Sequence, residues 1–153
     1  MNLLMVSIFA IFSLQLSYLD IKYGEIPRHF SIFMLICLFF THISTFATNN
    51  TPLLNSVTIP LTGTLFASII FGFVYFATQK KMGLADIWYA IGAGFVLGSK
   101  YFIISVLIAC VTAGIFFAIS HFAQKKGKTE KSIPFIPFLT MGYFFSLFCY
   151  YLA

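Results

Sequence analysis

Long runs of apolar residues, separated by short polar stretches, dominate the chain. A helix needs about 20 apolar residues to cross the hydrocarbon core of a bilayer. Runs of about this length lie at 1–19, 29–48, 57–78, 82–99, 101–122 and 133–152. The pattern predicts an all-α membrane protein with six transmembrane helices, forming one polytopic domain over residues 1–153.

The break between the fourth and fifth runs is only four residues long, at 98–101. A single helix over 87–122 would be about 54 Å long at 1.5 Å per residue, whereas the bilayer core is about 30 Å thick. A tight turn near Gly98 is therefore predicted. Gly94 and Gly98 also form a GxxxG pattern, which permits close helix approach. Packing within the chain is a better explanation of this pattern than dimerisation.

The basic residues are distributed unevenly between the polar gaps. Eight of the nine Lys and Arg residues fall in the first, third and fifth gaps, and only Lys100 falls on the other side. The eight are Lys22, Arg28, Lys80, Lys81, Lys125, Lys126, Lys128 and Lys131. Short cytoplasmic loops carry an excess of basic residues, so both termini are predicted on the extracytoplasmic side.

Composition excludes several classes of protein. The chain is 60% hydrophobic and only 8% charged, whereas about a quarter of the residues of a soluble domain are charged. Lipid is therefore its expected solvent, and the net charge of +5 fits membrane orientation better than nucleic-acid binding. The three cysteines form no CxxC pair, and the three histidines lie far apart. Neither a metal site nor a cofactor is predicted.

The four acidic residues all lie in the gaps predicted to be cytoplasmic: Asp20, Glu25, Asp86 and Glu130. Asp20 follows the first apolar run directly, and Asp86 stands at the start of the fourth. Both can therefore reach a similar depth, just inside the cytoplasmic boundary. A carboxylate in that position is costly unless it is paired or functional.

Two such carboxyls can perform acid–base chemistry if they approach each other. They cannot both ionise easily, so the pair holds a shared proton. One member can then deprotonate a water while the other protonates a peptide carbonyl. Placement alone leaves a plainer interpretation open: Asp86 could cap its helix, where an acid complements the dipole, and Asp20 could be a polar helix end.

Three segments favour the first interpretation. The segment from Asp20 to Pro27, DIKYGEIP, resembles the D-x5-I-P segment that follows the first catalytic Asp of type IV prepilin peptidases. Gly83-Leu-Ala-Asp86 resembles the GxGD motif of the same family, which presenilin-type proteases share. The segment 133–139, IPFIPFL, with Gly142 beyond, is similar to the opening of their last core helix.

The resemblance implies a membrane aspartyl endopeptidase in its short, catalytic-core-only form, with Asp20 and Asp86 as the catalytic pair. Its expected partners are the bilayer and the basic leader of a prepilin or pseudopilin, cut at the cytoplasmic face of a bacterial inner membrane. Glu25 is a candidate contact for a basic leader residue. The residues expected to support the motifs are Ile26, Pro27, Gly83, Ala85, Pro134 and Pro137.

Two rival interpretations remain at this stage. A scaffold or proton-coupled carrier could use the acids as a polar pair, although a carrier is expected to place them near the bilayer midplane. An inactive relative is also compatible with the chain, because Ala85 stands where the family motif has its second Gly.

Overall fold

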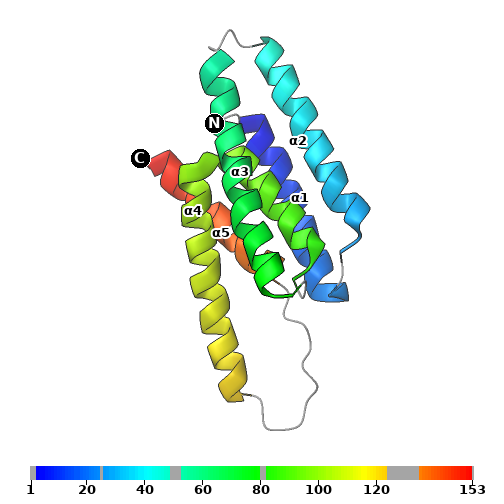
Figure 1. Ribbon diagram of the computed structural model, residues 1–153, viewed down its shortest axis with the longest axis vertical. Helices are drawn as coiled ribbons and strands as arrows, with labels where there is room; N and C mark the ends of the chain where they lie inside the picture. Colours follow the sequence, from blue (N-terminus) through cyan, green and yellow to red (C-terminus); the bar gives the residue numbers. More distant parts are fainter. Residues whose placement is uncertain (1–2, 25, 49–52, 80–81, 124–134, 153) are drawn as a thin grey trace.

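The computed structural model describes residues 3–24, 26–48, 53–79, 82–123 and 135–152, and all the regular structure in them is helical. The side chains of 28, 48, 53–56 and 120–123 are not described. The helices are α1 (Leu3–Tyr23), α2 (Arg28–Thr48), α3 (Leu53–Ala77), α4 (Leu84–Ala123) and α5 (Ile136–Leu152) (Figure 1). The predicted all-α class is confirmed.

The helices have the length and surface of membrane-spanning segments. Four of them (α1 to α4) contain stretches long and apolar enough to cross a bilayer, and α5 is a shorter apolar helix. Large apolar side chains such as Ile69, Phe73 and Phe76 point outward and are more than two-thirds exposed. Exposed apolar surface on this scale requires lipid around it. The protein is therefore a multi-pass membrane protein.

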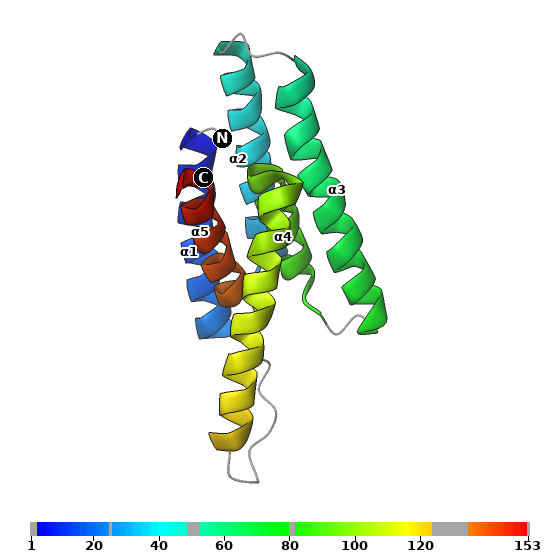
Figure 2. The ribbon, with the colours of Figure 1, turned by 90° about the vertical axis from the view of Figure 1, so that its left-hand side faces the viewer.

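Helix α4 is interrupted at the position where the sequence predicts a turn. Gly98 has φ 70° and ψ 172°, a backbone conformation far from helical and readily adopted only by glycine. The ribbon of α4 rises through its green first part and descends through its yellow second part (Figures 1 and 2). Residues 84–97 and 99–123 consequently form two helical arms of a hairpin.

Side-chain contacts between α3 and α4 require the same reversal. Ile59 lies against Gly98, whereas the rings of Phe71 and Phe102 have centroids 6.3 Å apart. If α4 were straight, Phe102 would lie about 6 Å beyond Gly98 along the helix axis. Phe71 lies about 18 Å from Ile59 along α3, on the other side of the contact between Ile59 and Gly98. Only a chain that turns back at Gly98 brings these two rings together.

The first arm of α4 packs against α3 through glycines. A Cβ on Gly63 would collide with the Gly94 carbonyl and would lie 2.8 Å from the Gly98 Cα. A Cβ on Gly94 would in turn lie 2.9 Å from the Gly63 carbonyl carbon. The GxxxG pattern therefore serves an intramolecular contact, as the sequence interpretation favoured.

The second arm of α4 packs against α5. A Cβ on Gly142 would meet the backbone of Ser105, and the rings of Tyr101 and Tyr150 have centroids 5.1 Å apart. On its other side α5 faces α1, where Phe9 contacts both Tyr89 and Tyr143, at centroid separations of 5.3 and 4.7 Å. These contacts bring α1, the first arm of α4 and α5 around one core.

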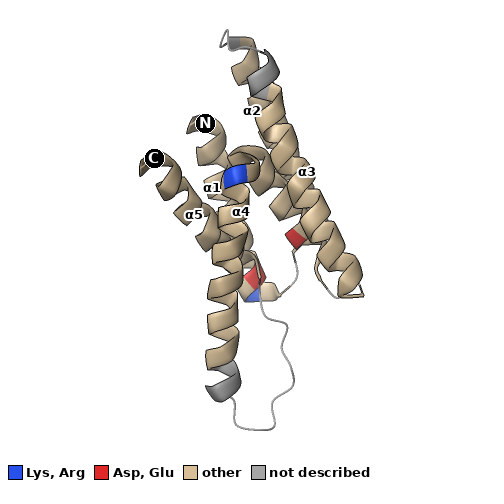
Figure 3. Ribbon diagram, turned by 60° about the vertical axis from the view of Figure 1, so that its left-hand side comes forward, with Lys and Arg blue, Asp and Glu red and all other residues tan. Residues whose placement is uncertain are grey.

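The described charges separate toward the two ends of this bundle. The acidic positions of α1 and α4 lie toward one end, with the basic position of α1 beside them (Figure 3). The basic position of α4, at the Gly98 turn, lies toward the end that carries both termini (Figure 3). The other bases used to predict topology have side chains outside the described residues.

We expect Gly63→Ala to destabilise the fold, because its methyl group would have to displace the Gly94 backbone rather than a flexible side chain. Overpacking of this kind costs about 1–3 kcal/mol. Thermal unfolding in detergent, followed by circular dichroism, measures the effect. Gly72→Ala on the same helix is the matched control, since a Cβ there meets nothing within 4 Å. Equal melting temperatures for the two variants would contradict the close packing.

Candidate active site

Asp20 lies within α1 rather than after it. The apolar run predicts a helix end near residue 19, but α1 continues to Tyr23. It ends at Gly24, whose φ of 69° is favourable for glycine and whose amide donates to the Asp20 carbonyl at 2.9 Å. Asp20 is consequently held on the last turn of a regular helix, and only 8% of its surface is exposed.

The Asp20 carboxylate meets the N-terminus of α5. The Ile136 amide donates to Asp20 Oδ2 at 3.1 Å, and the Phe135 backbone is also hydrogen-bonded to this carboxyl. The first amides of a helix have no partner within it and carry its positive dipole end, so they bind carboxylates well. Pro137, in the first turn of α5, has no amide to satisfy and its ring suits that position.

Asp86 lies in the first turn of α4. Its amide donates to the Gly83 carbonyl at 3.2 Å, and its carboxyl accepts a hydrogen bond from the Gly83 backbone. A side chain that reaches back to the residue preceding the helix caps that helix. Asp86 therefore has the capping geometry that the plainer interpretation requires. A carboxylate can accept several hydrogen bonds, so capping leaves part of the Asp86 carboxyl free for other interactions.

The fold brings the two acids together. Asp20 and Asp86 are 66 positions apart in the sequence, yet their carboxyls are close enough to interact electrostatically. Figure 3 shows both acidic positions toward the same end of the bundle, with that of α1 nearer the end. Sequence reasoning could place each acid at a helix boundary but could not show that α1 and α4 adjoin.

A cluster of hydroxyl groups, three buried and one half-buried, lies one to two helical turns from the acids along their helices. Sequence reasoning did not identify it. Tyr89 Oη lies 3.0 Å from Ser13 Oγ and 3.3 Å from Thr140 Oγ1. Ser17 Oγ lies 2.6 Å from the same Thr140 oxygen. These four residues are one or two helical turns from Asp20, Asp86 or Ile136. This spacing can be read from the sequence. It indicates a cluster, however, only when the three helices are known to pack together.

The remaining motif residues have structural positions around the acids. Ile26 is half-buried against the core, and the Pro27 carbonyl accepts the Phe30 amide at 3.0 Å in the first turn of α2. Gly83 precedes α4, and Ala85 packs half-buried within its first turn. Glu25, Glu130 and Pro134 lie outside the described residues.

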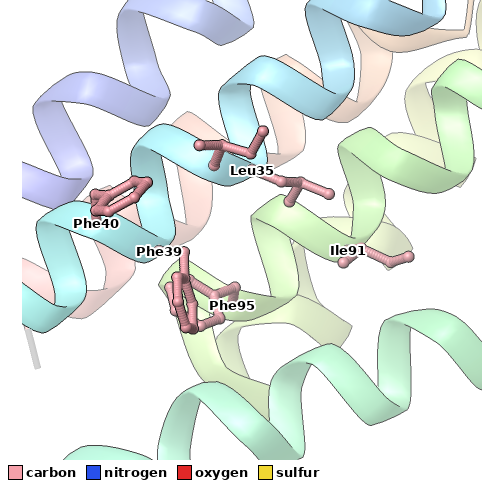
Figure 4. A pocket seen from close by; sticks show the side chains of 6 residues that line it. Leu35, Phe39, Phe40, Ile91 and Phe95 are labelled. Atoms are coloured by element: carbon pink, nitrogen blue, oxygen red, sulfur yellow. The ribbon is translucent and has the colours of Figure 1, made fainter.

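The acid pair is separate from the pocket between α2 and the first arm of α4. This pocket has a volume of about 330 Å³ and is lined by Leu35, Ile36, Phe39, Phe40, Ile91 and Phe95 (Figure 4). Its lining offers no group for acid–base chemistry. Among the residues that the structure describes, no three His, Cys, Asp or Glu side chains are grouped so that they could hold a metal ion.

Comparison with known families gives a match over most of the chain. The family model described as the type IV leader peptidase family matches residues 7–118. The matched segment contains both Asp20 and Asp86, but the predicted third motif, 133–139, lies outside it. No curated protein and no solved structure matches the chain.

We expect Asp20→Ala to loosen the start of α5 and Asp20→Asn to preserve it. Both changes remove the carboxylate, but Asn keeps an oxygen that can accept the Ile136 amide hydrogen. Leaving that amide without an acceptor costs about 1–2 kcal/mol. Hydrogen exchange in detergent, resolved over the first turn of α5, measures the local effect. Equal protection of that turn in the two variants would contradict the cap.

Proposed function

The chain belongs to the type IV leader peptidase family, and on that premise we propose that this protease is of the aspartic type, with Asp20 and Asp86 as its catalytic pair. Its proposed substrate is the basic leader of a prepilin or pseudopilin, cleaved at the cytoplasmic face of a bacterial inner membrane. Pilus assembly or protein secretion is the process that such cleavage serves.

One observation carries the proposal: carboxyls from two helices distant in sequence interact at one end of the bundle. The backbone amides at the starts of α4 and α5 hold these carboxyls from two directions. Bonds of this kind restrict how far each side chain can rotate. The acids are thus preorganised, which a reaction that depends on both groups acting together requires.

The proposed chemistry is hydrolysis without a covalent bond between enzyme and substrate. The pair shares one proton. The ionised carboxyl takes a proton from water as the water oxygen bonds to the scissile carbonyl carbon, while the protonated carboxyl donates to the carbonyl oxygen. On collapse of the tetrahedral intermediate, the carboxyl that took the proton from water donates it to the departing nitrogen as the C–N bond breaks. The other carboxyl, now ionised, takes a proton from a hydroxyl of the intermediate, which restores the pair and releases an amine and a carboxylic acid. Glu25 is proposed to meet a basic residue of the leader.

The proposed topology has six membrane crossings and both termini on the extracytoplasmic side. It counts the two arms of α4 separately and adds α5 to α1, α2 and α3. The acids and Lys22 then lie at the cytoplasmic end, and Lys100 lies at the opposite end. Lys22 contacts the Tyr18 and Tyr23 rings, and Lys100 contacts the Tyr101 ring. Lysines with tyrosines are typical of membrane boundaries, which supports this assignment.

The conformation of Ala85 bears on whether the chain is an inactive relative. Positive φ at this position would strain any residue with a Cβ. Ala85 instead lies in the first turn of α4 and is not among the residues of positive φ. Alanine is a favourable residue in a helix. The departure from the family motif therefore gives no backbone reason for loss of activity.

Asp20→Asn and Asp86→Asn should each reduce prepilin processing by at least about 100-fold, because neither amide can exchange a proton with water or substrate as a carboxyl does. Co-expression with a candidate prepilin and an immunoblot mobility shift measures cleavage. Membrane levels of each variant are compared with wild type, and Glu130→Gln serves as an acid-to-amide control. Processing at the wild-type rate by either aspartate variant would remove it from the catalytic pair.

Reporter fusions test the topology. A fusion after Lys128 should report a cytoplasmic location, and one near Asn50 an external location, because basic loops are retained inside. Alkaline phosphatase and green fluorescent protein, fused at each position, give opposite signals and control for expression. A periplasmic signal after Lys128 would refute the six-crossing arrangement.

A further inference from the structure

We propose that the hydroxyl cluster formed by Ser13, Ser17, Tyr89 and Thr140 positions the two acids relative to each other, with Thr140 as its central residue. The inference rests on the proposed function of Asp20 and Asp86. It adds positioning residues whose hydrogen bonds, within the described part of the chain, go to groups other than the two acids. They act through the helices that carry the acids.

Thr140 is the point where the cluster converges. Its hydroxyl lies 2.6 Å from Ser17 Oγ, accepts from Tyr89 Oη at 3.3 Å and donates to the carbonyl of Ile136, in its own helix, at 2.8 Å. Tyr89 Oη also lies 3.0 Å from Ser13 Oγ, within hydrogen-bond distance. Hydroxyl groups are expensive to bury in an apolar bundle unless they are bonded. Their mutual bonds therefore fix three helices in one relative arrangement.

This arrangement determines whether α5 can reach Asp20. Ser17 is three residues before Asp20 on α1, and Thr140 is four residues after Ile136 on α5. The contact between the two hydroxyls lies about one turn below the bond from the Ile136 amide to Asp20. A slip of α5 along α1 would lengthen both contacts together. The hydroxyl contact thus sets the register in which the amide meets the carboxylate.

The same cluster extends to the second acid. Tyr89 is three residues after Asp86 on α4, so its side chain lies one turn below that carboxyl. Its ring is fully buried against Phe9, and its hydroxyl joins α1 to α5. The first turn of α4 is consequently tied to the helices that hold Asp20. Four hydroxyls thereby connect the supports of both carboxyls.

A positioning role and simple structural support predict different kinetics. Ser13, Tyr89 and Thr140 are all at most 4% exposed, so they do not form a surface on which a leader peptide could bind. Loss of a positioning hydroxyl should lower kcat and leave KM nearly unchanged. Loss of structural support alone should lower the amount of folded enzyme and leave kcat per folded molecule unchanged.

The test compares three variants of purified enzyme in detergent, cleaving a prepilin peptide. Thr140→Val keeps the side-chain shape but removes the hydroxyl, and we expect kcat to fall about tenfold or more with KM within about twofold. Thr140→Ser should restore most of kcat because it retains the hydroxyl. Tyr89→Phe, which also removes a hydroxyl of the cluster, should likewise lower kcat. Each kcat is normalised to the folded fraction.

Thr112→Val is the matched control. Thr112 makes the same kind of bond to a carbonyl four residues earlier, that of Ile108 at 2.9 Å, and its side-chain bonds to other described residues both lie within α4. Its removal should leave kcat unchanged. The proposal is overturned if Thr140→Val and Tyr89→Phe retain wild-type kcat, or if Thr112→Val loses as much activity as they do.

A second measurement separates this inference from the proposed function. A hydrophobic carbodiimide reacts with carboxyl groups in apolar surroundings, and mass spectrometry gives its rate of addition to Asp20 without any substrate. Thr140→Val should change this rate several-fold and Thr112→Val should not. The wild type could cleave no prepilin while Thr140→Val still changes the labelling rate of Asp20 and Thr112→Val does not. That result would uphold the positioning role of the cluster and refute the proposed substrate. Unchanged labelling in Thr140→Val would overturn the positioning role.

Discussion

The absence of water in the bilayer core requires every buried backbone polar group to find a partner within the protein. Regular helices meet this requirement internally except at their ends. Near the cytoplasmic boundary proposed for this chain, α4 and α5 begin close to the end of α1, and their free amides need acceptors. The two aspartates supply them: Asp86 accepts from the residue before α4, and Asp20 accepts from the start of α5.

The same bonds leave room for a second role of the aspartates, the proposed catalytic one, which is usually considered an alternative to capping. A capping acid complements the helix dipole, and that is often its complete function. Here the capping carboxyls come from different helices and are also close enough to interact electrostatically. Because the caps are backbone bonds from the starts of helices, the positions of the carboxyls follow from how the helices pack. The helix caps and the proposed chemistry at this site therefore depend on the same interactions.

Close packing of the helices is what makes this placement reproducible. Gly63 and Gly94 allow α3 and the first arm of α4 to approach at backbone distance, and Gly142 does the same for α5 and the second arm. With no hydrophobic driving force between helices in lipid, such contacts and interhelical hydrogen bonds provide the specificity. The hydroxyl cluster around Thr140 adds the polar part of that specificity beside the acids.

Much of this molecule is determined by its sequence alone. Apolar runs of membrane-spanning length require helices, the excess length of 87–122 requires an interruption, and only glycine readily adopts the conformation found at Gly98. The acidic residues at run boundaries and the motifs around Asp20 and Asp86 identified the family that the comparison then matched. These features are local, so chain order and composition suffice to predict them.

Other features depend on which helices are neighbours. The end of α1 lies beyond Asp20, because a cap at Gly24 rather than the end of the apolar run terminates it. The bond from Ile136 to Asp20 spans 116 positions, and the cluster of Ser13, Ser17, Tyr89 and Thr140 gathers side chains from three helices. A serine or threonine in an apolar run has the same sequence signature whether its bonds stay within its own helix, as those of Thr112 do, or also reach neighbouring helices, as those of Thr140 do. Packing alone distinguishes the two, because the partner is supplied by a helix whose position the local sequence does not specify.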